Sequence, residues 1–225
     1  MTSFQKRVAS GLNITTVSRD QVQEHFITIT PEKGETPDSQ FHRAAEAVRR
    51  LDAKVVSVET LGFAPGDRNA VQVLTHAFDN GGLPLAWVEN SRTDNLCGVH
   101  IWAVTGAQVR PLSVHGRRTG SVFDDGVVQY CRLAGLLPPD IRAQRPEQAA
   151  AVFEQMESLL HTVGMGFGDV LRTWFYNDNI LGWYKEFNGV RNRFFTEQFI
   201  DVGLAGLSVE LLNEWRGDVK IDVRR

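Results

Sequence analysis

Apolar residues recur every three or four positions between Pro146 and Val163, in "PEQAAAVFEQMESLLHTV". This spacing predicts an amphipathic helix with its proline in the first turn, where proline is tolerated. The run "DVLRTWFYN" after it is rich in β-branched and aromatic residues and predicts a strand. The apolar positions of the helix are Ala149, Val152, Phe153, Met156, Leu159, Leu160 and Val163.

Three alternating glycines, Gly164, Gly166 and Gly168, lie between this helix and this strand. A phosphate-binding loop has the opposite order, because its anion is held by the amides of a helix that follows the glycines. Glycines at the end of a helix instead supply the left-handed backbone angles that terminate it. We therefore interpret the segment as a helix-to-strand connection and not as a nucleotide site.

The second half of the chain continues this alternation. "GVVQYCRLAGLLP" (126–138) predicts a strand, and "ILGWYKEFNGVRNRFF" (180–195) predicts a second amphipathic helix. "IDVGLAGL" (200–207) and "GDVKIDVRR" (217–225) predict a last pair of strands. From about residue 113 onward the predicted order is β-β-α-β-α-β-β.

The first half shows a similar order. Strands are predicted for 24–30, 54–63, 83–90 and 98–106. Thr36 and Pro37 begin a helix whose apolar face contains Phe41 and Leu51, and a shorter helix is predicted over 68–78. Both halves place a glutamine early in the first helix, Gln40 and Gln148.

We infer two copies of one α+β unit, residues 1–112 and 113–225, each a β-sheet with two helices packed on one face. The other face of each sheet then needs a partner. In the strand 170–176 we expect Leu171, Thr173 and Phe175 to face the helices. Val170, Arg172, Trp174 and Tyr176 then face the other way, either against a second sheet, in the same chain or another subunit, or into solvent.

Composition excludes several classes of function. The chain has 225 residues and a formal charge of −3, which favours neither nucleic acid nor an anionic membrane as partner. It contains no apolar run long enough to span a membrane and no signal-peptide pattern, so we expect a cytoplasmic protein. Cys97 and Cys131 are expected to be buried, inert thiols. The six histidines form no local metal motif, and we expect no metal and no cofactor.

These segments resemble the RidA family, the reactive intermediate deaminases also called the YjgF or endoribonuclease L-PSP family. "CRLAGLLP" resembles the family's strand ending in Ser-Gly-Gln-x-Pro. The segments 147–179 and 182–195 resemble its helix-glycine-strand unit and the helix after that. The resemblance covers about residues 120–225 and is weaker in the first half. Paired units in one chain also resemble the chorismatases, hydrolases with two RidA-like domains.

The resemblance implies a chorismate-mutase-like fold and a homo-oligomer, with a trimer favoured and small-molecule pockets between subunits. It places Gly135 at the family's ligand-binding backbone glycine. The family's arginine, cysteine and glutamate positions fall on Phe199, Asp201 and Arg224. An aromatic ring does not grip a carboxylate, and a cation does not act as the acid, so the usual deaminase pair is replaced.

Three charged residues remain candidates for a site. Arg132 and Arg172 lie centrally in predicted strands, where they are either structurally paired or bind an anion between sheets. Glu210 lies in "SVELLNEWRG" (208–217) and is either an acid carried into a pocket or part of a surface helix, together with Glu214.

These residues support three hypotheses of function. The first is a RidA-like protein that binds a small carboxylated or aromatic metabolite, as a deaminase or hydrolase with altered catalytic residues. The second is a non-catalytic ligand-binding or assembly protein. The third is a chorismatase-like hydrolase of an enolpyruvyl ether with Glu210 as proton donor.

Overall fold

A computed structural model describes residues 2–62, 73–74, 76–78, 82–89, 96–197 and 218–224, and these form two sheets. The first sheet has the strand order β1-β2-β3-β6-β4-β5 and the second has the order β10-β11-β9-β8-β7. The strands of the first sheet are β1 (Ser3–Ala9), β2 (Leu12–Arg19), β3 (Val22–Ile29), β4 (Lys54–Gly62), β5 (Leu85–Glu89) and β6 (Leu96–Thr105). Those of the second are β7 (Arg110–Val114), β8 (Arg117–Asp124), β9 (Gln129–Leu136), β10 (Val170–Tyr176) and β11 (Asp218–Arg224).

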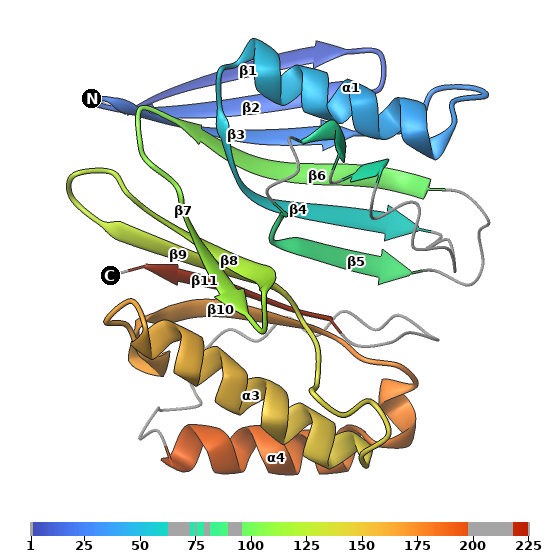
Figure 1. The fold of residues 1–225 in the computed structure, drawn as a ribbon, viewed down its shortest axis with the longest axis vertical. Coiled ribbons are helices and arrows are strands. Elements are labelled where there is room, and N and C mark those ends of the chain that lie inside the picture. The colour runs from blue at the N-terminus through green and yellow to red at the C-terminus, as the bar shows by residue number, and fades with distance from the viewer. Residues whose placement is uncertain are drawn as a thin grey trace.

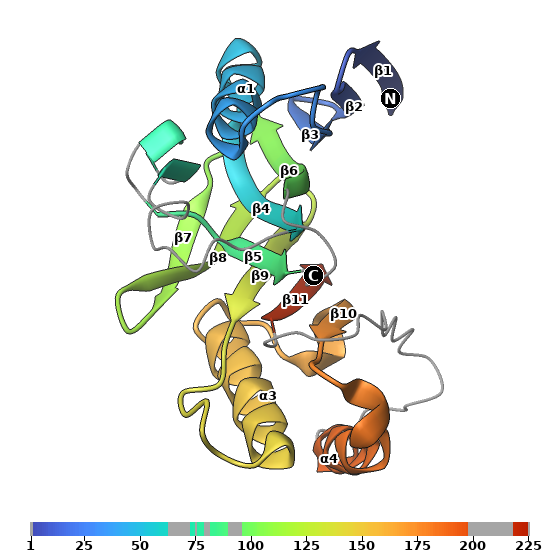
Figure 2. The ribbon, with the colours of Figure 1, turned by 90° about the vertical axis from the view of Figure 1, so that its right-hand side faces the viewer.

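Helices cover one face of each sheet. The helix α1 (Pro37–Arg50) packs on the first sheet, and α3 (Arg145–His161) and α4 (Tyr184–Glu197) pack on the second. Leu74 and Ala77, from the helical residues 73–74 and 76–77, are buried in the same core as α1. Both sheets lie between α1 and the α3–α4 pair (Figures 1 and 2). The expected architecture of two α+β units, each with helices on one face, is confirmed.

Each unit has its own apolar core. Under α1, Phe41, Ile27 and Ile101 are fully buried, as the helical spacing of Phe41 predicts. In the second unit Phe153 of α3 lies at the centre, with its ring 5.0 Å from that of Phe175 and 4.9 Å from that of Phe194. The 3.6-residue periodicity therefore identified the buried faces of both helices.

The predicted helix-to-strand connection is confirmed. The helix α3 ends at His161, Gly164 takes a left-handed backbone angle (φ +73°), and a short 3₁₀ turn at Phe167–Asp169 leads into β10. The strand therefore follows the glycines, in the order that excludes a phosphate loop.

Two expectations about individual strands are wrong. Val170 packs against the helices while Leu171 is 54% exposed, because a bulge between Val170 and Arg172 shifts the register with β11 and exchanges the two faces. Cys97 is exposed, because it lies near the start of β6, beyond Val99, where the pairing with β3 ends. Cys131 is buried as expected, and burial raises its pKa to about 12.

The strands β1 and β2 were not predicted from the sequence. They form an antiparallel hairpin at one edge of the first sheet, and every residue of β1 is exposed. An exposed edge strand has no apolar alternation to reveal it, since neither face is buried. Within the described part of the chain, no helix is both long enough and apolar enough to cross a membrane.

The glutamines that begin the two helices play the same role in both units. The Gln40 side-chain amide donates to the Ile29 carbonyl at 3.5 Å. The Gln148 amide donates to the carbonyls of Ile141 and Ala143 at 3.0 and 2.8 Å. Each glutamine ties its helix to the chain segment that precedes it, which agrees with two copies of one unit.

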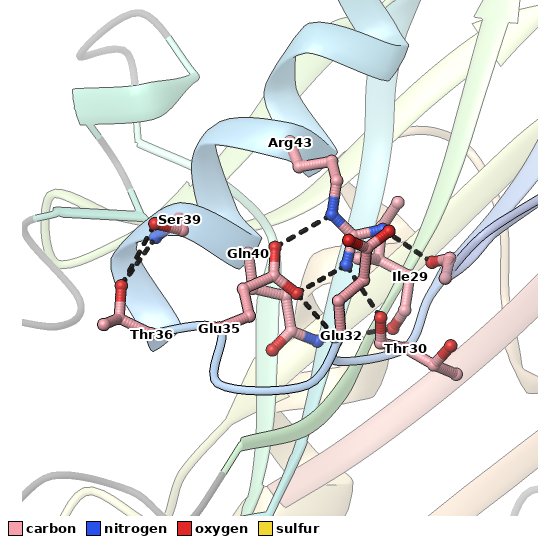
Figure 3. Close-up of polar contacts among 9 residues, drawn as sticks. Ile29, Thr30, Glu32, Glu35, Thr36, Ser39, Gln40 and Arg43 are labelled. Atoms are coloured by element: carbon pink, nitrogen blue, oxygen red, sulfur yellow. Dashed lines mark hydrogen bonds and ion pairs between the residues drawn. The ribbon is translucent and has the colours of Figure 1, made fainter.

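Arg43 joins three segments at the start of α1 (Figure 3). Its guanidinium donates to the carbonyls of Gly11 and Thr30 at 2.8 and 2.7 Å and to both carboxylate oxygens of Glu35 at 2.9 and 2.6 Å. It therefore links the β1–β2 turn, the end of β3 and the loop before α1. The helix itself begins at Thr36, whose side chain accepts from the Ser39 amide.

We expect Arg43→Gln to lower the free energy of unfolding by about 2–3 kcal/mol, because hydrogen bonds to a charged group are lost and two carbonyls each lose one of their donors. Urea denaturation measures this loss. Arg50→Gln is the matched control, because Arg50 is exposed and pairs only with Glu46 on the helix surface, where ion pairs contribute little. An equal effect of both substitutions would contradict the expectation.

The loss of stability in Arg43→Gln is expected to depend on pH. The hydrogen bonds from Arg43 hold the pKa of Glu35 below its usual value. A lowered folded-state pKa stabilises the protein above the unfolded pKa, and this contribution disappears as the pH falls through the folded value. The difference between the original protein and Arg43→Gln should therefore shrink in acid, below about pH 4.

Candidate functional site at the seam between the sheets

The two sheets pack against each other through the faces that carry no helices. The Trp102 ring of β6 lies 5.5 Å from the Phe123 ring of β8 and 6.4 Å from the Tyr130 ring of β9. Val22, Val56 and Val104 complete this cluster. Trp174 and Tyr176 of β10 turn towards the first sheet, where Tyr176 packs on Val88 of β5. Tyr176 is buried as expected and Trp174 is partly buried, and the covering sheet belongs to the same chain.

A second contact between the sheets lies near the β8–β9 turn. The Arg19 guanidinium of β2 donates to the Tyr130 hydroxyl at 2.6 Å, and that hydroxyl donates to the Asp125 carboxylate at 2.9 Å. Arg19 also lies 3.4 Å from the buried Glu24 carboxylate. The two sheets are therefore joined by polar as well as apolar contacts.

A row of polar residues crosses the inner face of each sheet. In the second sheet, Arg172 of β10 and Arg132 of β9 both lie opposite position 222 of the intervening β11, and Ser121 of β8 lies opposite Arg132. In the first sheet, Thr28, His100 and Glu59 are cross-strand neighbours on β3, β6 and β4. We call the space between these rows, with Trp102 and Trp174, the seam.

Arg132 and Glu59 form an ion pair across the seam. The Arg132 Nη2 donates to Glu59 Oε1 at 2.8 Å, and the two side chains are only 5% and 9% exposed. Burial raises the pKa of Glu59, since the attraction of Arg132 and His100 offsets the loss of hydration only in part. The same loss lowers the pKa of Arg132 to about 10. Each charge therefore offsets part of the free energy that the other loses on leaving water.

His100 extends this cluster towards the first sheet. Its Nδ1 lies 3.1 Å from the Thr28 hydroxyl, and burial lowers its pKa although the Glu59 charge acts in the opposite direction. The imidazole is consequently neutral near pH 7. A neutral imidazole beside a carboxyl group of raised pKa is an arrangement that can transfer protons.

The two arginines predicted from the sequence share one aromatic ring. The Arg132 Cζ lies 5.2 Å and the Arg172 Cζ lies 5.1 Å from the centre of the Trp174 ring, both within cation–π range. Arg132 is buried and also lies 6.0 Å from the Trp102 ring, whereas Arg172 is exposed. Arg132 is thus part of the contact between the sheets, and Arg172 presents its guanidinium at the edge of the seam.

Gly135 lies where β9 meets β5 of the first sheet. It has a left-handed backbone angle (φ +65°), and a Cβ atom added to it would be 2.0 Å from the Leu85 carbonyl oxygen. The Gly135 carbonyl accepts a hydrogen bond from the Arg117 guanidinium. The position where the resemblance implies a ligand-binding glycine is therefore in contact with the backbone of β5.

The remaining predicted residues come from the C-terminal part of the chain. Phe199, Asp201, Glu210 and Glu214 lie outside the described residues. Arg224 is in β11 and pairs with Tyr130 of β9. Sequence reasoning missed Glu59 and His100. The available signal for Glu59 was a carboxylate within an apolar strand. Its charge is opposite to that of Arg132, which is likewise a charged residue in the middle of a strand.

The fold and the seam define the chain as an α+β protein of two sheets that pack face to face, with helices on the outer face of each. A solved chorismatase structure aligns with 98% of this chain and 78% of its own, with a TM-score of 0.62 and 12% identity, so the two share a fold. Structures of the RidA/YjgF family also match. The Escherichia coli YjgF gene product covers 51% of this chain and 92% of its own, at 17% identity and a TM-score of 0.40.

The Escherichia coli protein TdcF with bound serine aligns over 51% of this chain and 92% of its own, at 18% identity and a TM-score of 0.39. No family model matches the sequence, and no curated protein matches it. The resemblance to the chorismatases that the sequence shows is thus confirmed at the level of the fold.

Proposed function

We propose that the chain binds a small aromatic carboxylate at the edge of the seam, with Arg172 and Trp174 as its main contacts. The observation that supports this is the exposed Arg172 guanidinium, 5.1 Å from a partly exposed Trp174 ring. A guanidinium matches a carboxylate in a bidentate geometry, and an indole ring packs against an aromatic ring. Thr28 and His100, both partly exposed, face this edge from the first sheet.

Within this proposal the reaction is hydrolysis of an enolpyruvyl ether, the chorismatase type. The terminal vinyl carbon takes a proton from an acid, water then adds to the carbon that carries the ether oxygen, and the C–O bond breaks to give an alcohol and pyruvate. The acid must be protonated near neutral pH. Glu59 is the candidate acid at the seam among the described residues, because burial raises its pKa and so favours its protonated form. Glu210 remains the alternative donor proposed from the sequence.

A non-catalytic ligand-binding protein is the second candidate. The contact of Gly135 with the Leu85 backbone favours it over an enzyme of the family's usual type, because this retained family position takes part in packing between the sheets. A deaminase of imines is less well supported, since Phe199 and Arg224 stand at the positions of the family's arginine and glutamate.

The proposal is tested by titrating 3-hydroxybenzoate and chorismate into the protein and by assaying pyruvate. We expect Arg172→Gln to weaken binding about 10- to 100-fold, because a charge-assisted hydrogen bond is lost. Arg193→Gln, which removes an exposed arginine of α4, should leave binding unchanged.

The outcomes separate the candidates. Pyruvate release from chorismate, lost in Glu59→Gln, supports the hydrolase, and binding without turnover supports the second candidate. Ammonia from 2-aminoacrylate would instead support a deaminase. Equal affinity of the Arg172→Gln and original proteins for every probe would overturn the proposed site.

The organisation of the chain belongs to the same proposal. We propose that the two units comprise residues 1–112 and 113–225, a boundary that falls within β7.

We also propose that the protein forms a homo-oligomer, with a trimer favoured. Phe4 and Val8 support it, since they are 66% and 70% exposed on β1, beside the part of the first sheet that the second sheet leaves uncovered. The expected cytoplasmic location stays a proposal.

A further inference from the structure

A cavity of about 320 Å³ lies at the carboxyl end of α1, on the helix-covered side of the first sheet and so away from the seam. Its walls come from both units: Val48, Arg49 and Lys54 belong to α1 and β4, and Arg118 belongs to β8. We call it the α1 cavity. Its volume falls within the range of small-molecule sites.

The Arg118 side chain lines this cavity, and one of its hydrogen-bond donors has no acceptor in the part of the chain that the structure describes. Its Nη1 donates to the Gly82 carbonyl at 3.1 Å, but its buried Nε has no acceptor among the described residues. Burial lowers the pKa of Arg118, and no acidic group among the described residues offsets that effect. A guanidinium has five donor hydrogens, and leaving a buried one without an acceptor costs free energy. A rotation of the Arg118 side chain that presents its Nε to an anion inside the cavity would remove this cost.

The charges around the α1 cavity also favour an anion. Arg49, Lys54 and Arg118 line it, against Asp52 as the acid among its lining residues. Arg49 is already held by Glu46 at 3.1 Å and by the Ala77 carbonyl at 3.1 Å, so Arg118 is the principal donor. Val48, Phe78 and Leu83 also line the cavity and supply apolar surface.

We propose that the α1 cavity is a second ligand site, which binds a carboxylate or phosphate group carried on a compact apolar body. The anionic group accepts from the Arg118 guanidinium in the bidentate manner of arginine. The apolar body packs against Val48 and Phe78. Because Arg118 comes from the second sheet and the other walls from the first unit, an occupied cavity ties the two units together and raises the melting temperature.

The test uses phenyl phosphate and benzoate as probes in isothermal titration and thermal melting, with inorganic phosphate as the probe that lacks an apolar body. We expect phenyl phosphate or benzoate to bind and to raise the melting temperature. Arg118→Gln should weaken this binding at least tenfold, and Arg118→Lys should weaken it less, because it keeps the charge and loses the Nε donor. Without a probe, Arg118→Gln should melt no lower than the original protein.

Two controls make the result specific. Arg50→Gln removes a neighbouring charge that does not line the cavity and should leave the affinity unchanged. Arg172→Gln should also leave it unchanged, so that failure at the seam and failure at the α1 cavity are distinguished. Should Arg118→Gln fold poorly, Lys54→Gln provides a second variant at an exposed position.

The proposal is overturned if neither phenyl phosphate nor benzoate binds, or if Arg118→Gln binds them as tightly as the original protein. It is also overturned if Arg50→Gln weakens binding as much as Arg118→Gln, since the attraction would then be a general effect of surface charge. If inorganic phosphate binds as tightly as phenyl phosphate, the proposed contact between the apolar body and the cavity wall is ruled out.

Discussion

Replacing Arg132 with methionine is expected to lower the free energy of unfolding by about 3–5 kcal/mol at neutral pH. The substitution fills most of the volume of the arginine stem but leaves the Glu59 carboxylate, 9% exposed, without the guanidinium that lies 2.8 Å away. The contacts that the Arg132 guanidinium makes with the Trp102 and Trp174 rings are also lost. Urea denaturation followed by tryptophan fluorescence measures the loss.

The double variant Glu59→Met with Arg132→Met should be more stable than Arg132→Met alone, because no buried charge remains unpaired. The loss in Arg132→Met should also diminish in acid. Without the guanidinium, the pKa of Glu59 rises further above its unfolded value, so stability is retained below the unfolded pKa and lost as the pH rises through the folded one. A cost below about 1 kcal/mol, typical of an exposed pair, would show that the pair is not buried.

Replacing Gly135 with alanine is expected to cost roughly 2–5 kcal/mol. The left-handed backbone angle of Gly135 strains any residue with a Cβ atom by about 1–2 kcal/mol. The added Cβ would also lie 2.0 Å from the Leu85 carbonyl oxygen and 2.9 Å from the Arg117 Nη2. Since the nearest atom is backbone, β5 must move away from β9, and overpacking of this kind adds about 1–3 kcal/mol.

Gly164→Ala is the matched control for this substitution. Gly164 has a similar backbone angle (φ +73°) but no atom within 4 Å of an added Cβ, so its substitution should cost only the backbone strain. The difference between the two variants isolates the contact between β9 and β5. Equal costs in urea denaturation would mean that the two sheets do not meet closely at Gly135.

Several elements of the fold followed from local patterns. The spacing of Val152, Phe153 and Met156 identified the buried face of α3, and the order of helix, glycines and strand excluded a phosphate loop before any coordinates were known. These features depend on neighbours within a few positions along the chain. The β1–β2 hairpin left no comparable signal, because the residues of β1 are exposed on both faces.

The candidate site was only partly predictable. Arg132 and Arg172 stood out as long cations in central strands, and both lie at the seam. Their different roles did not follow from the sequence. Arg132 is 4% exposed, whereas Arg172 lies at an exposed edge. The bulge at Val170–Arg172 shows the same limit, because one inserted residue in the pairing with β11 reverses which side chains face the helices.

Hydrophobic periodicity and helix-terminating residues were sufficient to establish two α+β units, because the burial of a helix face depends on residues close together in the chain. The partner of each charge was decided by how the two sheets meet. Glu59 and Arg132 are separated by 73 residues and belong to different sheets. The Coulomb attraction and the loss of hydration that govern them depend on distance and burial in space, which no local pattern specifies.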